Sequence, residues 1–240
     1  MENIGYIGLS QQIALQQQID VTANNIANMS TPGFKAQHVL FTEYITTPKD
    51  AGAVHQSNNF GTYRDLTLGP LQQTSNKLDF AIQGEGYFVA QTPEGVRYTR
   101  DGGFSLNLDR QLVTKSGHIV FNENNNPLTF PTEASEIRVS DDGTISSEFG
   151  NIGRLKIVNF ENEQALKNAG DNLFDPADMV EQPVVNRRVV QGFVESSNVS
   201  AVTEMNRMIE LMRLFQATQK LLQNDHERQV GMIQKLTRVS

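Results

Sequence analysis

Two segments with helical heptad spacing lie at opposite ends of this 240-residue chain, and they strongly limit what it can fold into. In the first, residues 3–29, the seam positions recur at alternating four- and three-residue steps: Leu15, Ile19, Thr22, Ile26 and Met29. This spacing places the side chains on one side of a helix that packs against other helices. Pro32 and Gly33 then end the helix, because proline disfavours helix in the residue before it and glycine permits a reversal.

The second segment, residues 199–236, contains no proline and one glycine. Its apolar row follows the same spacing, with polar residues at 219, 226 and 229, and consists of Ala201, Met205, Met208, Met212, Phe215, Leu222, Ile233 and Leu236. Ser200 is a suitable N-cap, and Glu204 in the first turn suits the helix dipole. A single antiparallel pairing of the two helices would cover one seam on each. The apolar face that remains calls for further helices, which other subunits could supply.

The region between the helices has the pattern of short strands and turns. Residues 36–77 hold two prolines and three glycines with weak periodicity, and we interpret them as an extended linker or arm with strand pieces. From residue 78 to 190, alternating apolar stretches are separated by turn sequences such as Gly84-Glu85-Gly86 and Asp141-Asp142-Gly143. This pattern predicts an antiparallel β domain.

The predicted fold class is therefore α+β. The terminal helices, within residues 1–35 and 191–240, form a coiled-coil-like inner domain and flank a central antiparallel β domain at 78–190. We interpret Met205, Met208 and Met212 of the second helix as part of a core shared between subunits, since Met at helical spacing usually packs in a core.

Composition excludes several partners. The net charge is −7 and there is no basic stripe, so we expect no binding to nucleic acid. The chain has no cysteine, which excludes disulfides and cysteine-ligated metals. No stretch of about 20 apolar residues is present, so we expect no membrane insertion. The N-terminus lacks the basic residues and apolar core of a cleaved signal, which predicts export, if any, by another route.

We expect no catalytic, cofactor or metal site. The four histidines are scattered, and neither a phosphate-binding loop nor a dinucleotide fingerprint is present. The acidic turn at Asp141 lacks the alternating ligands of a calcium loop. One enzymatic alternative stays open: Asp79 and Glu85 could act as acid and base if the fold brought two carboxylates together in a cleft.

Three groups of motifs resemble the flagellar rod and hook family. The first is Asp20-Val21-Thr22-Ala23-Asn24-Asn25-Ile26-Ala27-Asn28, followed by Thr31-Pro32-Gly33-Phe34-Lys35. The second is Leu78-Asp79-Phe80-Ala81-Ile82-Gln83-Gly84-Glu85-Gly86-Tyr87-Phe88, with Tyr98-Thr99-Arg100-Asp101-Gly102 and Gln111-Leu112-Val113-Thr114. The third is Gly192 with Glu195-Ser196-Ser197-Asn198-Val199. They occur in the family's order and span most of the chain.

The resemblance implies a structural, non-enzymatic subunit of the bacterial flagellar basal body, whose rod spans the periplasm. It implies helical assembly with copies of itself and with other proximal and distal rod proteins, and export by the flagellar type III apparatus without a cleaved signal peptide. The stretch 210–222 and the short length most resemble the proximal-rod members. A distal-rod or hook-type protein and a secreted β-domain binding module are the alternatives.

From the seams we predict the assembly interface. Its residues are Leu15, Ile19, Thr22, Asn24, Asn25, Ile26 and Asn28 in the first helix, and Met205, Met208, Ile209, Met212, Phe215 and Leu222 in the second. We expect the amides of Asn24, Asn25 and Asn28 to be buried there and to bond between subunits, because buried polar groups need partners. The alternative is that they are ordinary exposed polar positions. The isolated helices should be only marginally stable, since seams without partners gain little from helix propensity.

Overall fold

The computed structural model describes residues 2–46, 54–132, 134, 136–184 and 188–237. The chain folds into two compact units. Unit 1 comprises residues 1–27, 36–65 and 199–240, and unit 2 comprises residues 28–35 and 66–198. The chain therefore passes between the units four times, at residues 27/28, 35/36, 65/66 and 198/199.

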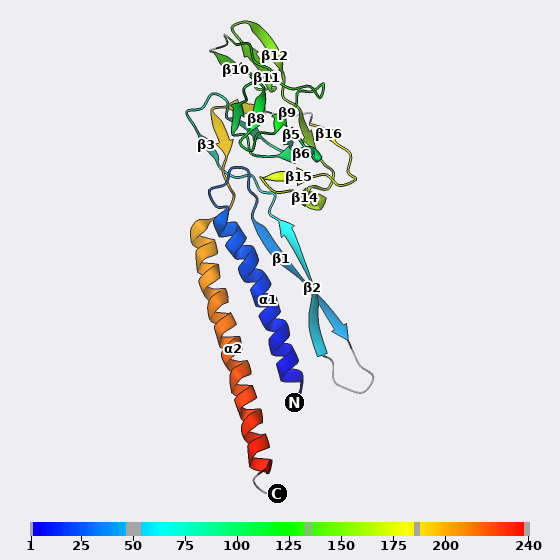
Figure 1. Cartoon of the computed structure of the whole chain (residues 1–240), viewed down its shortest axis with the longest axis vertical. Coiled ribbons are helices and arrows are strands. Elements are labelled where there is room, and N and C mark those ends of the chain that lie inside the picture. Colours follow the sequence, from blue (N-terminus) through cyan, green and yellow to red (C-terminus); the bar gives the residue numbers. More distant parts are fainter. Residues whose placement is uncertain (1, 47–53, 133, 135, 185–187, 238–240) are drawn as a thin grey trace. The chain divides into compact units, whose positions relative to one another are not determined.

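Unit 1 contains the two helices, α1 (Glu2–Ala27) and α2 (Ala201–Thr237). They run antiparallel, because Asn25 near the end of α1 bonds to Glu204 at the start of α2. Near the other end, Gly8 lies against Leu222. Figure 1 shows the two helices side by side, with the C-terminal end of α2 extending past the N-terminus of α1. The two predicted terminal helices are confirmed.

A two-stranded ribbon completes unit 1. Strands β1 (Gln37–Thr46) and β2 (Val54–Arg64) pair antiparallel, and the register shifts between Thr42 and Glu43. The ribbon lies beside α1 (Figure 1). It occupies much of the stretch 36–77, which the sequence presented as an arm with strand pieces.

Unit 2 is built around a nine-stranded antiparallel sheet. Its main path runs β14-β15-β6-β5-β9-β8-β7, and β13, which pairs with β5, also pairs with β16. The bounds of these strands are β5 (Tyr87–Thr92), β6 (Gly95–Thr99), β7 (Phe104–Leu106), β8 (Leu112–Thr114), β9 (Ile119–Val120), β13 (Ile157–Asn159), β14 (Lys167–Asn168), β15 (Leu173–Asp175) and β16 (Gln182–Pro183).

Smaller antiparallel sheets surround it in unit 2. One has the order β10-β11-β12, and two pairs are β17-β4 and β18-β3. Their bounds are β3 (Leu71–Gln73), β4 (Phe80–Gln83), β10 (Ile137–Val139), β11 (Thr144–Ser147), β12 (Gly150–Arg154), β17 (Arg188–Gln191) and β18 (Phe193–Glu195), and a short 3-10 helix covers Glu163–Ala165. Helices at both ends of the chain and a central antiparallel β region confirm the α+β class.

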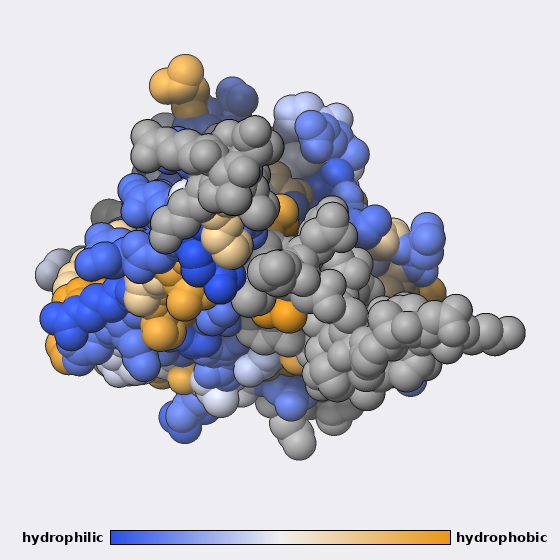
Figure 2. All heavy atoms as spheres, turned by 90° about the horizontal axis from the view of Figure 1, so that it is seen from below, coloured by the Kyte–Doolittle hydropathy of each residue, from blue (hydrophilic) through white to orange (hydrophobic). Residues whose placement is uncertain are grey.

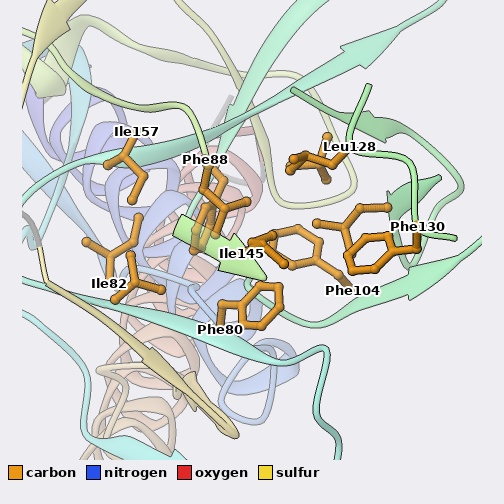
Figure 3. Packing of buried hydrophobic residues seen from close by; sticks show 12 residues of the cluster. Phe80, Ile82, Phe88, Phe104, Leu128, Phe130, Ile145 and Ile157 are labelled. Atoms are coloured by element: carbon orange, nitrogen blue, oxygen red, sulfur yellow. The ribbon is translucent and has the colours of Figure 1, made fainter. Parts of the chain in front are cut away.

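The main core of unit 2 is an apolar cluster of twelve buried side chains. Phe104 lies between Phe80 and Phe88, with ring centroids 5.9 and 5.1 Å away, and Figure 3 shows these rings packed with Leu128, Phe130 and Ile145. A second cluster forms around Tyr87, Tyr98 and Phe160. Unit 2 thus has its own hydrophobic core, as an independently stable β structure requires.

The predicted turns lie between the strands as expected. Gly84 and Gly86 join β4 to β5 with φ of 113° and 123°, a region that L side chains rarely adopt. Gly143 joins β10 to β11 with φ of 84° and donates its N–H to the carbonyl of Ser140. Both of these turn sequences therefore connect two strands in the structure, as the sequence predicted.

Candidate assembly surface and a buried charge cluster

The apolar row predicted along α2 divides between two sides of the helix. Met208, Phe215 and Leu222 are half-buried and lie on the same side as the buried Leu211. This inner side continues through buried Glu204 and Thr218, so two of its positions are polar. It faces α1, as the contacts of Glu204 with Asn25 and of Leu222 with Gly8 show.

The other predicted α2 residues lie outside this helix pair. Met205, Ile209 and Met212 are 46%, 50% and 48% exposed. Val202, at 71% exposed, continues the same 3-4-3 spacing, and we call these four residues the outer α2 row. Sequence reasoning missed Val202 because it followed the Ala201 position instead. Further exposed apolar side chains in unit 1 include Ile7, Leu9 and Ile13 of α1 and Leu214 and Leu221 of α2.

The predicted residues of α1 contribute mostly to packing within the chain. Leu15 and Thr22 are buried, and Ile19 and Ile26 are half-buried. Asn24 is exposed and Asn28 is half-buried. The structure thus places these residues at different depths, and several are already covered in a single copy.

Asn25 joins three elements of unit 1. It is 1% exposed, its Nδ2 donates to the carbonyl of Gln37 at 2.9 Å and to Glu204 Oε2 at 3.3 Å, and its Oδ1 accepts the N–H of Gln37 at 2.9 Å. The expectation that this amide bonds between subunits is therefore corrected. Its bonds lie within one chain, because the first turn of α2 and the start of β1 both reach it.

The space-filling view illustrates how apolar side chains reach the surface. Figure 2, seen from below, shows patches of hydrophobic residues between hydrophilic ones. Large apolar side chains left half in water at regular helical spacing are typical of a surface that another helix covers.

A cluster of three buried charged side chains lies in unit 2, and sequence reasoning did not single it out. Glu195 at the end of β18 is 2% exposed, Lys35 is 5% exposed and Arg100 is 4% exposed. Lys35 Nζ lies 2.5 Å from Glu195 Oε1, and Arg100 contacts Glu195 Oε2 through Nε at 2.9 Å and a terminal nitrogen at 2.8 Å. Each of the three comes from a different one of the motif groups described above.

Backbone groups complete the bonding of this cluster. Arg100 donates to the carbonyls of Gly84 and Gly86, which belong to the turn between β4 and β5. Lys35 donates to the carbonyl of Thr67 at 2.8 Å, and the N–H of Gly69 donates to Glu195 Oε1 at 3.0 Å. A buried ion group persists only when its remaining donors and acceptors find partners of this kind.

Two glycines let the backbone approach the cluster. Gly33 has φ of 72°, and a Cβ there would lie 2.6 Å from backbone atoms of Arg100 and Asp101. A Cβ at Gly69 would lie 1.8 Å from the carbonyl oxygen of Ser196. The Thr31–Lys35 motif therefore docks directly on the backbone of the Tyr98–Gly102 motif, which explains why it needs glycine.

The electrostatics of the cluster favour a structural role. Burial lowers the pKa of the Lys35 ammonium, while Glu195 acts in the opposite direction. All three charged ends are enclosed and already bonded, so the cluster offers no open position for a substrate.

The two carboxylates that were left open as an acid–base pair each bond to the amide of an asparagine side chain. Asp79 accepts a bond from Asn76, and Glu85 accepts one from Asn159, so each carboxylate has its own partner. No group of three metal-ligating side chains gathers in the part of the chain that the structure describes. Neither of the described helices has an apolar stretch long enough to cross a bilayer.

Comparison with known proteins identifies the class. Residues 6–35 match the family "Flagella basal body rod protein", residues 81–147 match "Flagellar hook protein FlgE/F/G D1 domain", and residues 190–234 match "Flagellar basal body rod FlgEFG protein C-terminal". These three segments contain Lys35, Arg100 and Glu195, and they contain the helix residues that were predicted to form the assembly interface. The chain belongs to the rod and hook proteins of the bacterial flagellum.

Relatives of full length narrow the assignment. The flagellar basal-body rod protein FlgF of Caulobacter vibrioides is 33% identical over 100% of both chains, and that of Mesorhizobium japonicum is 34% identical over 92% of both. The flagellar basal-body rod protein FlgG of Agrobacterium fabrum is 34% identical over 87% of this chain and 90% of its own. Within the class, this chain is a member of the flagellar basal-body rod protein FlgF family.

Proposed function

We propose that this chain is a structural subunit of the flagellar basal-body rod and that it assembles through the outer α2 row and the exposed part of α1. One observation carries the assembly surface. α2 is already paired with α1 on one side, yet Val202, Met205, Ile209 and Met212 remain about half or more exposed. The partners at this surface are other copies of this chain and other rod proteins.

The physical balance favours assembly once one helix pair exists. Fully burying a large apolar side chain contributes roughly 1.5–3 kcal/mol, so completing the burial of a half-exposed one contributes about half of that. Ordering a free helix costs on the order of 1–2 kcal/mol per residue in backbone entropy. Because the bond between Asn25 and Glu204 and the packing of Leu211 already order part of both helices, less of this cost falls on assembly.

The finer role follows from family likeness and from this surface. We place the chain in the proximal rod, where a stiff helical tube passes torque to the hook and filament without a chemical step. We also infer that it leaves the cytoplasm through the flagellar type III export apparatus without a cleaved signal peptide. Long helices that have few partners in the monomer unfold readily, which suits passage through a narrow channel.

A charge placed on the outer α2 row tests the proposal. Met212→Asp should prevent completion of the rod and abolish swimming, because a carboxylate cannot be buried between helices without a partner. Ile26→Asp should act likewise, although it also disturbs packing within the chain. The matched control is Ala217→Asp, which adds the same charge at another exposed α2 position. Normal rods and swimming in the Met212→Asp strain would contradict the proposal.

A further inference from the structure

The buried charge cluster lies beside the points where the chain enters and leaves unit 2. Lys35 is the last residue before the passage at 35/36, Thr67 and Gly69 follow the passage at 65/66, and Glu195 precedes the one at 198/199. All of these residues belong to unit 2. They are far apart in sequence, since Lys35 and Glu195 are separated by 160 positions and Arg100 and Glu195 by 95.

Hydrogen bonds join the segments 33–35, 67–69 and 195–198 to one another. Lys35 reaches both Thr67 and Glu195, and Gly69 donates to the same carboxylate. The N–H of Gly33 donates to the carbonyl of Glu195 at 2.7 Å.

Asn198 adds a second set of ties. Its N–H donates to the carbonyl of Phe34 at 3.4 Å, and its Nδ2 donates to the carbonyl and the hydroxyl of Thr67 at 3.1 and 3.2 Å. The three segments 33–35, 67–69 and 195–198 are thus held as one bonded group, and Arg100 fastens that group to the β4–β5 turn.

We propose that the Lys35–Glu195–Arg100 cluster is a lock on these three segments, and that the rod needs it to carry load rather than to assemble. The claim that the cluster carries load rests on the proposed function. The claim that it is a lock rests on a contrast in unit 2: the core is apolar and separate, whereas charged side chains fix the segments where the chain enters and leaves the unit. Buried ion groups add little net stability compared with apolar packing, but they define one geometry and are costly to break.

A charge-balanced variant isolates the lock. Lys35→Met with Glu195→Gln removes one positive and one negative charge, so the net charge of the cluster is unchanged. The amide oxygen that Glu195→Gln introduces can still accept bonds from Arg100, whereas the N–H of Gly69, which bonds to the other carboxylate oxygen, loses its acceptor. The single variants Lys35→Met and Glu195→Gln complete a double-mutant cycle, which reports the coupling between the two side chains.

Hydrogen exchange of the full-length chain gives the first measurement. In the double variant, the amides of Gly33, Gly69 and Asn198 should exchange about a hundredfold faster, in line with the loss of a buried pair. The amides of Leu112 and Phe121, which bond within the sheet region to Leu128 and Val89, should keep their rates. Equal acceleration at both sets, or no acceleration at Gly33, Gly69 and Asn198, would overturn the lock.

Gly33→Ala disturbs the same docking without changing any charge. Its Cβ would meet the backbone of Arg100 and Asp101, so it should give the same local pattern of faster exchange. This second variant keeps the test decisive if the charge variant does not fold, and slow exchange in Gly33→Ala at the amides that bond to Glu195 would count against the lock.

Strains carrying these variants provide the functional measurement. Complete rods and hooks with swimming that fails in viscous medium are the expected result. Normal swimming at high viscosity would overturn the load-bearing role, and so would missing rods. These outcomes are independent of the proposed assembly surface, because the Met212→Asp strain tests that surface with the lock intact.

Discussion

Asn25 Nδ2 of α1 and Glu204 Oε2 of α2 lie 3.3 Å apart inside unit 1, and both residues are almost fully buried. The same amide closes a two-way bond with the backbone of Gln37 at the start of β1. One side chain therefore joins two helices and the ribbon, and the consequences for stability can be measured.

Asn25→Ala should loosen unit 1. The substitution leaves the N–H and carbonyl of Gln37 and the carboxylate of Glu204 without this partner, and each buried unsatisfied group costs about 1–3 kcal/mol. Hydrogen exchange in the first turns of α2 should accelerate, while exchange in the core of unit 2 stays unchanged. Unaltered exchange around Glu204 would show that the bond does not hold the helices together.

Gly8 of α1 and Gly231 of α2 form a matched pair for the contact between the helices. At Gly231 a Cβ would meet nothing within 4 Å, so Gly231→Ala should raise helix stability by about 0.8–1 kcal/mol. At Gly8 a Cβ would lie 2.5 Å from Leu222 Cδ2, so Gly8→Ala should lose part or all of the same gain. Circular dichroism during thermal unfolding of the helices measures both; equal gains would contradict the close approach of α1 and α2.

Leu211→Asp and Met212→Asp place the same charge at adjacent positions with opposite surroundings. Leu211 is 5% exposed, so its loss should destabilise the helix pair in the isolated chain by at least the roughly 2–5 kcal/mol of a large-to-small core substitution. Met212 is half exposed, and its replacement should leave that stability nearly unchanged. Urea unfolding followed in the helices separates the two; similar losses would mean that the outer α2 row is not free in the monomer.

The raised pKa of Tyr98 should make the free energy of unfolding of unit 2 depend on pH in the alkaline range. Burial, together with its bond to Glu181 at 2.6 Å, raises the pKa of the Tyr98 hydroxyl above its ordinary value near 10. The folded state therefore keeps its proton where the unfolded state loses it, and the stabilisation is present below pH 10 and declines above it. The slope from this one proton is at most about 1.4 kcal/mol per pH unit.

Tyr98→Phe should remove that part of the decline. Glu181 keeps its ion pair with Lys156 in the variant, so the carboxylate is not left without a partner. Urea unfolding of unit 2 between pH 9 and 11 provides the comparison. An identical alkaline decline in the wild type and in Tyr98→Phe would assign the effect to other groups.

The sequence was sufficient to predict the helices and strands, but not which side of each helix is covered within the chain. Repeats of 3.5 residues and strand alternation separated by turns are local signals, and both helices and the antiparallel sheet followed from them. The inner side of α2, however, includes Glu204 and Thr218, and hydrophobic spacing does not select polar positions. The prediction therefore merged Met208 and Phe215, which are half-buried against α1, with Met205 and Met212, which are exposed.

The charge cluster shows a different limit. Lys35, Arg100 and Glu195 were visible in the family motifs, but a charged residue beside a turn normally lies in solvent. Their convergence depends on the pairing of β18 with β3 and on the docking of Gly33 against Arg100, which are contacts between distant parts of the sequence. Gly33 and Gly69 allow these close backbone contacts, but a glycine in a sequence is read first as a turn, as Gly33 was here.

The central claim, that other subunits cover the outer α2 row in the rod, can be tested with one thiol. The chain contains no cysteine, so Met212→Cys introduces a single reactive site. A maleimide should label it readily in the purified monomer, poorly in isolated basal bodies and readily again after the rods are dissolved in denaturant. Labelling in intact basal bodies at the monomer's rate would contradict the claim.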